Sequence, residues 1–177
     1  MSLILGVDPG LTRCGYGLID TEKNSAIDFG LFTSGVTQAP RDRVGEISIG
    51  LENLVQSHKP DLIALERVFA QANLRSVMGV AQISGALMAI AYRHDIPLEF
   101  FTPSEVKAAV TGNGRADKAA VGMMVGKILG LPEVPKPADV ADALAVAICA
   151  SKRALGVGTS AQRKWVAAAK AANRKLG

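Results

Sequence analysis

Three strand-like segments follow one another at the start of the chain, and no segment with helical spacing separates them. They cover residues 3–8, 15–19 and 27–33, with a turn at Pro9-Gly10 and another in the polar stretch 21–25. Consecutive strands joined by turns predict an antiparallel meander. The chain is therefore expected to fold around a sheet.

The rest of the chain alternates between helices and strands. Buried strands are expected over residues 62–65 and 97–101, because both segments are short and apolar. Apolar spacing and the breaks at Gly and Pro predict helices over residues 41–57, 73–94, 104–110, 117–129 and 138–155. This order predicts an α/β fold, a mixed sheet with helices packed on it.

Length and composition favour one globular unit. A chain of 177 residues, 49% hydrophobic and 20% charged, suits a single domain with a full-sized core. Cys14 and Cys149 lie in apolar stretches, which predicts reduced core thiols of a cytoplasmic protein, and the N-terminus shows no export signal. The uncharged stretch between Arg75 and Arg93 is rich in Ala and Gly, so we predict a buried helix and no membrane span.

The charge is unevenly distributed. Residues 151–177 hold seven basic residues and no acidic one, although the whole chain has a net charge of only +4. The chain is accordingly divided into a domain at 1–155 and a basic C-terminal tail at 156–177. The tail could follow DNA phosphates or could be a solvated chain end, and the sequence leaves both readings open.

Four acidic residues stand in apolar surroundings. Asp8 and Glu66 each close an apolar strand, whereas Asp139 and Asp142 lie three residues apart in an apolar helix. A spacing of three places both helical carboxylates on one face. Because burying an unpaired carboxylate costs several kcal/mol, a cation is expected to neutralise the group.

Magnesium is the cation that such a site would take. Mg²⁺ prefers carboxylate oxygens and retains waters, and two ions about 3.5–4 Å apart can activate a water and stabilise the leaving oxygen of a phosphodiester. The residues thus predict a site for a pair of Mg²⁺ ions at Asp8, Glu66, Asp139 and Asp142, suited to phosphodiester chemistry. Structural roles remain open for three of them: Asp8 as a turn residue, Asp139 as a helix cap, and Glu66 in an ion pair with Arg67.

Five short motifs, in order over about residues 3–150, resemble the RuvC family of crossover (Holliday) junction endodeoxyribonucleases in the ribonuclease H-like superfamily. An Asp-Pro-Gly turn followed by Gly-x-Gly opens the series, and an Asp-x-x-Asp-Ala helix ends it. The motifs are Gly6-Val-Asp8-Pro9-Gly10 with Gly15-Tyr-Gly17, Glu66-Arg-Val-Phe69, Pro103-Ser-Glu-Val-Lys107, Gly112-Asn-Gly114-Arg-Ala-Asp-Lys118, and Asp139-Val-Ala-Asp142-Ala.

The resemblance implies a sheet whose first three strands are antiparallel and whose later strands are parallel. It implies paired symmetric nicking of four-way junctions by a homodimer with two Mg²⁺ per active site, for which Mn²⁺ could substitute, working beside RuvA–RuvB. By the same resemblance, the metal-binding catalytic residues would be Asp8, Glu66, Asp139 and Asp142. Lys107 and Lys118 would contact phosphates, and Phe69 would stack on a base. Solvated lysines and a core phenylalanine are the structural alternatives.

Other classes of protein share parts of this pattern. A non-catalytic DNA-binding or structural module would have no reason to line up four carboxylates, because they repel phosphate. An actin-like nucleotide-binding protein uses a similar strand and Asp turn, but it normally needs two domains around the nucleotide. A YqgF-like nuclease shares the Asp-Pro-Gly opening, whereas the lysine-bearing region and the Asp-x-x-Asp-Ala helix favour RuvC. The helix at 73–94, which carries no charge between Arg75 and Arg93, has a row of small residues at Ala81, Gly85 and Ala89 and is the expected dimer surface.

Overall fold

The computed structural model describes residues 2–67 and 74–154, and it contains a five-stranded mixed sheet in the order β3-β2-β1-β4-β5. The strands are β1 (Leu3–Asp8), β2 (Arg13–Asp20), β3 (Ser25–Thr33), β4 (Leu62–Glu66) and β5 (Leu98–Phe101). The predicted meander is confirmed, because β1–β2 and β2–β3 pair antiparallel. Strands β4 and β5 extend the sheet in parallel with β1.

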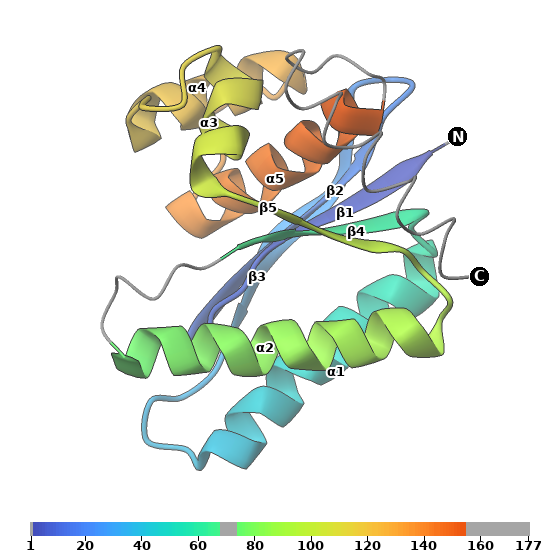
Figure 1. The fold of residues 1–177 in the computed structure, drawn as a ribbon, viewed down its shortest axis with the longest axis vertical. Coiled ribbons are helices and arrows are strands. Elements are labelled where there is room, and N and C mark those ends of the chain that lie inside the picture. Colours follow the sequence, from blue (N-terminus) through green and yellow to red (C-terminus); the bar gives the residue numbers. More distant parts are fainter. Residues whose placement is uncertain (1, 68–73, 155–177) are drawn as a thin grey trace, which may run out of the picture.

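Helices cover both faces of the sheet (Figure 1). The helices are α1 (Pro40–His58), α2 (Leu74–Arg93), α3 (Pro103–Thr111), α4 (Lys118–Ile128) and α5 (Ala138–Ala154). Helices α1 and α2 lie on one face, while α3, α4 and α5 lie on the other. All five expected helices are present, with ends within one or two residues of those predicted. Within the described ranges, no helix is both long and apolar enough to cross a membrane.

The alternation of β1 divides its side chains between two cores. Ile4 belongs to the core under α3, α4 and α5, whereas Leu5 and Val7 belong to the core under α1 and α2. Because successive side chains of a strand point to opposite faces, Asp8 shares the face of Ile4. In β4 the same rule places Glu66 on the face of the buried Ala64, again under α5.

Helix α5 lies unusually close to the sheet. A Cβ added to Gly6 would collide with the backbone oxygen of Ala143, and one added to Gly15 would collide with that of Asp139. Only glycine permits such an approach of two backbones. The Gly-x-Gly motif therefore brings the first turn of α5 against β2, beside the end of β1.

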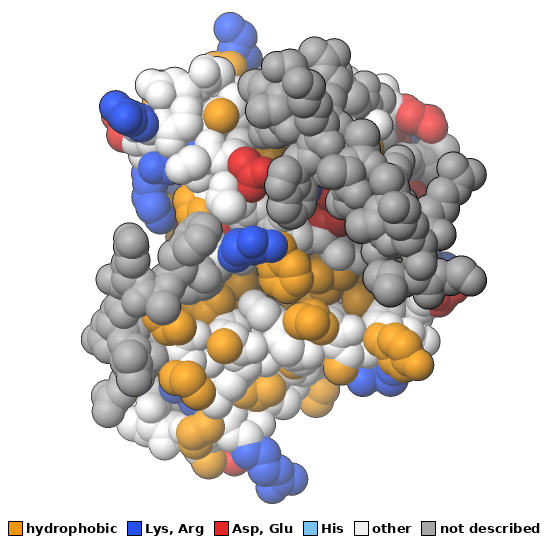
Figure 2. Space-filling view, in the orientation of Figure 1, with side chains coloured by type: hydrophobic (Ala, Val, Ile, Leu, Met, Phe, Trp, Pro, Cys, Tyr) orange, Lys and Arg blue, Asp and Glu red, His pale blue; other side chains and the backbone are white. Residues whose placement is uncertain are grey.

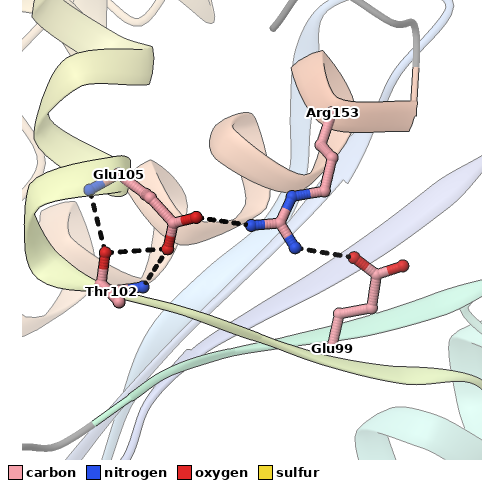
Figure 3. Close-up of polar contacts among 4 residues, drawn as sticks. All are labelled: Glu99, Thr102, Glu105 and Arg153. Atoms are coloured by element: carbon pink, nitrogen blue, oxygen red, sulfur yellow. Dashed lines mark hydrogen bonds and ion pairs between the residues drawn. The ribbon is translucent and has the colours of Figure 1, made fainter. Parts of the chain in front are cut away.

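A network of charged side chains ties the far end of α5 to β5 and α3 (Figure 3). Arg153 of α5 forms ion pairs with Glu105 at 3.0 Å and with Glu99 at 3.4 Å, and its guanidinium lies 4.0 Å from the centre of the Phe101 ring. Thr102 and Glu105 form a capping box that starts α3. These contacts fix α3, which carries Lys107, relative to α5.

Candidate active site

The four predicted carboxylates meet at one end of the sheet. Asp8 and Glu66 end two neighbouring parallel strands whose preceding residues, Val7 and Leu65, are register partners. Asp139 and Asp142 lie in the first two turns of α5, above that end. Three elements far apart in the sequence therefore supply one acidic site.

Mutual repulsion shows in the pKa of Asp8. Burial and the negative charges of Glu66, Asp142 and Asp139 raise this pKa to about 7. The positive charge of Lys118 offsets part of the rise. The pKa of Glu66 is raised as well, mainly by burial and then by Asp142. Carboxylates that hinder one another's ionisation are stabilised by a bound cation.

Two of the carboxylates are engaged by basic side chains. Lys118 Nζ lies 2.9 Å from Asp142 Oδ2, and this contact raises the pKa of the lysine. Arg13 donates from Nε and Nη2 to Asp139 Oδ2, at 3.1 and 2.8 Å, and holds the pKa of Asp139 below its usual range. Both helical carboxylates thus face cations supplied by the chain.

The donor set fits a hard divalent cation. All four side chains offer carboxylate oxygens, which are ligands that Mg²⁺ and Mn²⁺ bind. The negative charges of the other three carboxylates all act on Asp8. Among the described side chains, no three His, Cys, Asp or Glu residues are arranged as a complete ligand set. Because Asp139 and Asp142 are paired with Arg13 and Lys118, a metal would have to compete for them.

The predicted phosphate-binding lysines lie beside the carboxylates. Lys118 contacts Asp142, and the positive charge of Lys107 offsets part of the rise in the pKa of Glu66. Between the two lysines, the turn after α3 includes Gly112 in a left-handed conformation, with φ of 80°. The structure therefore places both lysines near the acids, and their contact with DNA phosphates stays a prediction.

The structure bears differently on the structural roles that the sequence left open for the predicted site residues. Asp139 does lie in the first turn of α5, where an acid complements the helix dipole, but its side chain reaches Arg13. Arg67, the alternative ion-pair partner of Glu66, has its guanidinium carbon 5.9 Å from the centre of the Phe100 ring. Phe69 and the tail at 156–177 fall outside the described residues, so their proposed roles remain predictions.

Arg13 is the residue that sequence reasoning missed. It belongs to β2, two residues before Gly15, and meets a carboxylate 126 positions away. Nothing in its local sequence separates it from an ordinary surface arginine. Only the close packing of α5 on β2 reveals the contact.

A comparison with protein families gives one match over most of the chain. The family model described as "Crossover junction endodeoxyribonuclease RuvC" matches residues 4–150, which include all four carboxylates and both lysines. The chain belongs to the RuvC family.

Individual RuvC proteins resemble the chain over most of their length. The "Crossover junction endodeoxyribonuclease RuvC" of Saccharopolyspora erythraea is 48% identical, over 97% of this chain and 88% of the relative. The Thermus thermophilus RuvC structure has a TM-score of 0.80 at 29% identity, covering 87% of this chain and 96% of that one. A second T. thermophilus RuvC structure, in complex with a Holliday junction substrate, has a TM-score of 0.79 at 29% identity, covering 84% and 92%.

Proposed function

We propose that this chain resolves four-way DNA junctions by paired symmetric nicks, as a divalent-metal-dependent endonuclease. The convergence of four carboxylates from β1, β4 and α5, expressed in the raised pKa of Asp8, carries the proposal. Membership of the RuvC family supports it, and neither an actin-like nucleotide-binding protein nor a YqgF-like nuclease is favoured by the family match.

Asp8, Glu66, Asp139 and Asp142 would hold two Mg²⁺ ions, with Mn²⁺ as a substitute. When bound, such ions lower the pKa of a water and neutralise charge on the phosphodiester. Lys107 and Lys118 would hold neighbouring phosphates and would offset part of the repulsion between the carboxylates and the DNA. Phe69 is proposed to stack on a base at the crossover.

A homodimer would supply the two active sites that paired nicking requires. Helix α2 presents an exposed stripe, the α2 face, made up of Met78, Ala81, Gly85, Met88, Ala89 and Tyr92. Met78, Met88 and Tyr92 are 56%, 50% and 88% exposed, and Figure 2 shows hydrophobic side chains gathered over this helix. Ile83, Leu87 and Ile90 of α2 are buried within the domain and lie outside this face.

The α2 face is close to the active site. A hollow beside Glu66 is bounded by Arg67 and Phe100 on one side and by Val77, Val80, Ala81 and Ser84 of α2 on the other. A two-fold contact along α2 would therefore place both catalytic centres next to the same interface. By family resemblance, the RuvA–RuvB machinery is the proposed further partner.

The decisive experiment is incubation of the full chain with a synthetic four-way junction and Mg²⁺. We expect two nicks at symmetric positions on opposing strands, detected on a denaturing gel with each strand labelled in turn. A linear duplex of the same sequence and a reaction with chelator are the controls. An intact junction in both Mg²⁺ and Mn²⁺, or equal cutting of the duplex, would contradict the proposal.

A further inference from the structure

Arg13 is positioned to oppose metal binding at Asp139. It shares with Gly15 the face of β2 on which α5 packs, because alternate residues of a strand point the same way. Its guanidinium donates two hydrogen bonds to a single oxygen, Asp139 Oδ2. A divalent cation that bound this oxygen would meet a fixed positive charge and two competing donors.

The same guanidinium is accessible from solvent. The Arg13 side chain is 47% exposed, compared with 27% for the Asp139 side chain that it contacts. A guanidinium can donate two parallel hydrogen bonds to a phosphate as well as to a carboxylate. A DNA phosphate arriving at the site is therefore an alternative acceptor for Arg13.

We propose that Arg13 is a positioning residue that couples metal binding to DNA binding. It occupies Asp139 in the metal-free protein, and it releases this carboxylate to the metal when a DNA phosphate takes up the guanidinium. The ordering keeps the complete metal site from forming before the substrate is present. This inference rests on the proposed nuclease function for its DNA arm, but the competition between Arg13 and a metal does not.

The test measures divalent-metal affinity directly, by calorimetry with Ca²⁺ on the full chain. Ca²⁺ takes carboxylate oxygens. In free protein, Arg13→Gln should bind Ca²⁺ about two- to five-fold more tightly than wild type, which is the range that an exposed ion pair supports. Arg13→Lys keeps a positive charge without the planar fork, so its affinity should lie between the two.

The second arm repeats the measurement with a saturating four-way junction, whose integrity is verified on a gel after each run. DNA phosphates attract Ca²⁺ in every variant, so the informative quantity is the ratio between variants. The junction should tighten Ca²⁺ binding more in wild type than in Arg13→Gln. The ratio of the Ca²⁺ affinity of the variant to that of wild type should therefore fall toward one.

The control is Arg93→Gln, which breaks a closely matched ion pair far from the site. Arg93 Nη2 lies 2.8 Å from Glu52 Oε1, the same distance as between Arg13 Nη2 and Asp139 Oδ2. The side chains of Arg93 and Glu52 are 52% and 29% exposed, and those of Arg13 and Asp139 are 47% and 27% exposed. It should leave Ca²⁺ affinity unchanged. Free Arg13→Gln that binds Ca²⁺ no more tightly than wild type, or a junction that tightens both proteins equally, would overturn the inference.

The outcome is separable from that of the proposed function. Wild type that fails to cut junctions while Arg13→Gln still gains metal affinity in free protein would remove the nuclease proposal and leave the competition standing. Wild type that cuts junctions while Arg13→Gln shows no gain in affinity would remove both the competition and the coupling and leave the nuclease proposal standing.

Discussion

Lys118 of α4 and Asp142 of α5 form an ion pair of 2.9 Å, so a proposed DNA-binding lysine and a proposed catalytic carboxylate contact each other directly. The lysine is 74% exposed at its side chain and the carboxylate 23%. A lysine in this position can turn toward a phosphate without rearrangement of the backbone, because its stem is long and flexible. The basic and acidic parts of the site are therefore one electrostatic unit.

Removing single carboxylates should separate cutting from binding. We expect Asp8→Asn, Glu66→Gln and Asp142→Asn each to abolish junction cleavage, while gel-shift affinity for the junction stays the same or rises. The reason is that each change removes a metal ligand together with a charge that repels phosphate. Near wild-type cleavage by any of the three would show that the site is assigned wrongly.

The two lysines should contribute to binding through phosphates. Lys107→Ala and Lys118→Ala are expected to weaken junction binding, and each should reduce the dependence of log K on log salt by about one unit. Fluorescence anisotropy over a salt series measures this slope. Lys127→Ala, an exposed lysine in the last turn of α4, serves as the control. Unchanged slopes in both variants would show that Lys107 and Lys118 are solvated side chains that contact no phosphate.

The raised pKa of Asp8 makes the stability of the metal-free protein depend on pH. Asp8 ionises near its ordinary value of 3.8 in the unfolded chain but only at about 7 in the fold. Between these values the folded state holds a proton that the unfolded state has lost, so stability falls as the pH rises from about 4 to about 7. In chelator, wild type should lose on the order of 1–3 kcal/mol more than Asp8→Asn between pH 5 and pH 8.

Urea unfolding at the two pH values measures this difference, and the comparison with Asp8→Asn cancels the other titrating groups. Added Mg²⁺ should restore wild type at pH 8 and have a much smaller effect on Asp8→Asn. Parallel pH profiles for the two proteins would contradict the assignment of a buried, repelled carboxyl to Asp8.

A charge on the α2 face should break the proposed dimer. Gly85→Glu is expected to yield monomers by analytical ultracentrifugation and to reduce paired nicking, because two glutamates would approach each other across the two-fold contact. Gly45→Glu on α1 is the matched control, since an added Cβ at either glycine meets nothing within 4 Å in the monomer. An intact protein that sediments as a monomer at micromolar concentration, with or without junction, would exclude the dimer.

The Arg153 network should matter more for stability than an exposed ion pair. Arg153→Ala loses two ion pairs and the contact with the Phe101 ring, so we expect a loss of about 1–2 kcal/mol in the free energy of unfolding. Arg153→Lys should recover only part of it, because lysine lacks the planar guanidinium. Arg93→Ala, which breaks an exposed pair, should cost about 0.2–1 kcal/mol. Equal losses for Arg153→Ala and Arg93→Ala in urea unfolding would count against the network.

The sequence alone determined the secondary structure, and it singled out the acidic residues proposed for the site. Short apolar runs and helical spacing located five strands and five helices to within about two residues, because each pattern reflects how its element is buried. Asp8 and Glu66 stood out at the ends of apolar strands, and Asp142 stood out inside an apolar helix. A carboxylate is conspicuous in such places because of its desolvation cost.

Only the tertiary structure decided how these groups face one another. The ion pairs Arg13–Asp139 and Lys118–Asp142 join positions 126 and 24 residues apart, and local sequence carries no signal for contacts of that kind. The same holds for α2, where spacing alone could not say which apolar side chains are buried, as Ile83 and Leu87 are, and which remain exposed, as Met78 and Met88 do. The physical reason is that burial and charge pairing depend on the packing of whole elements, which is set by long-range close approaches such as that of Gly15 to α5.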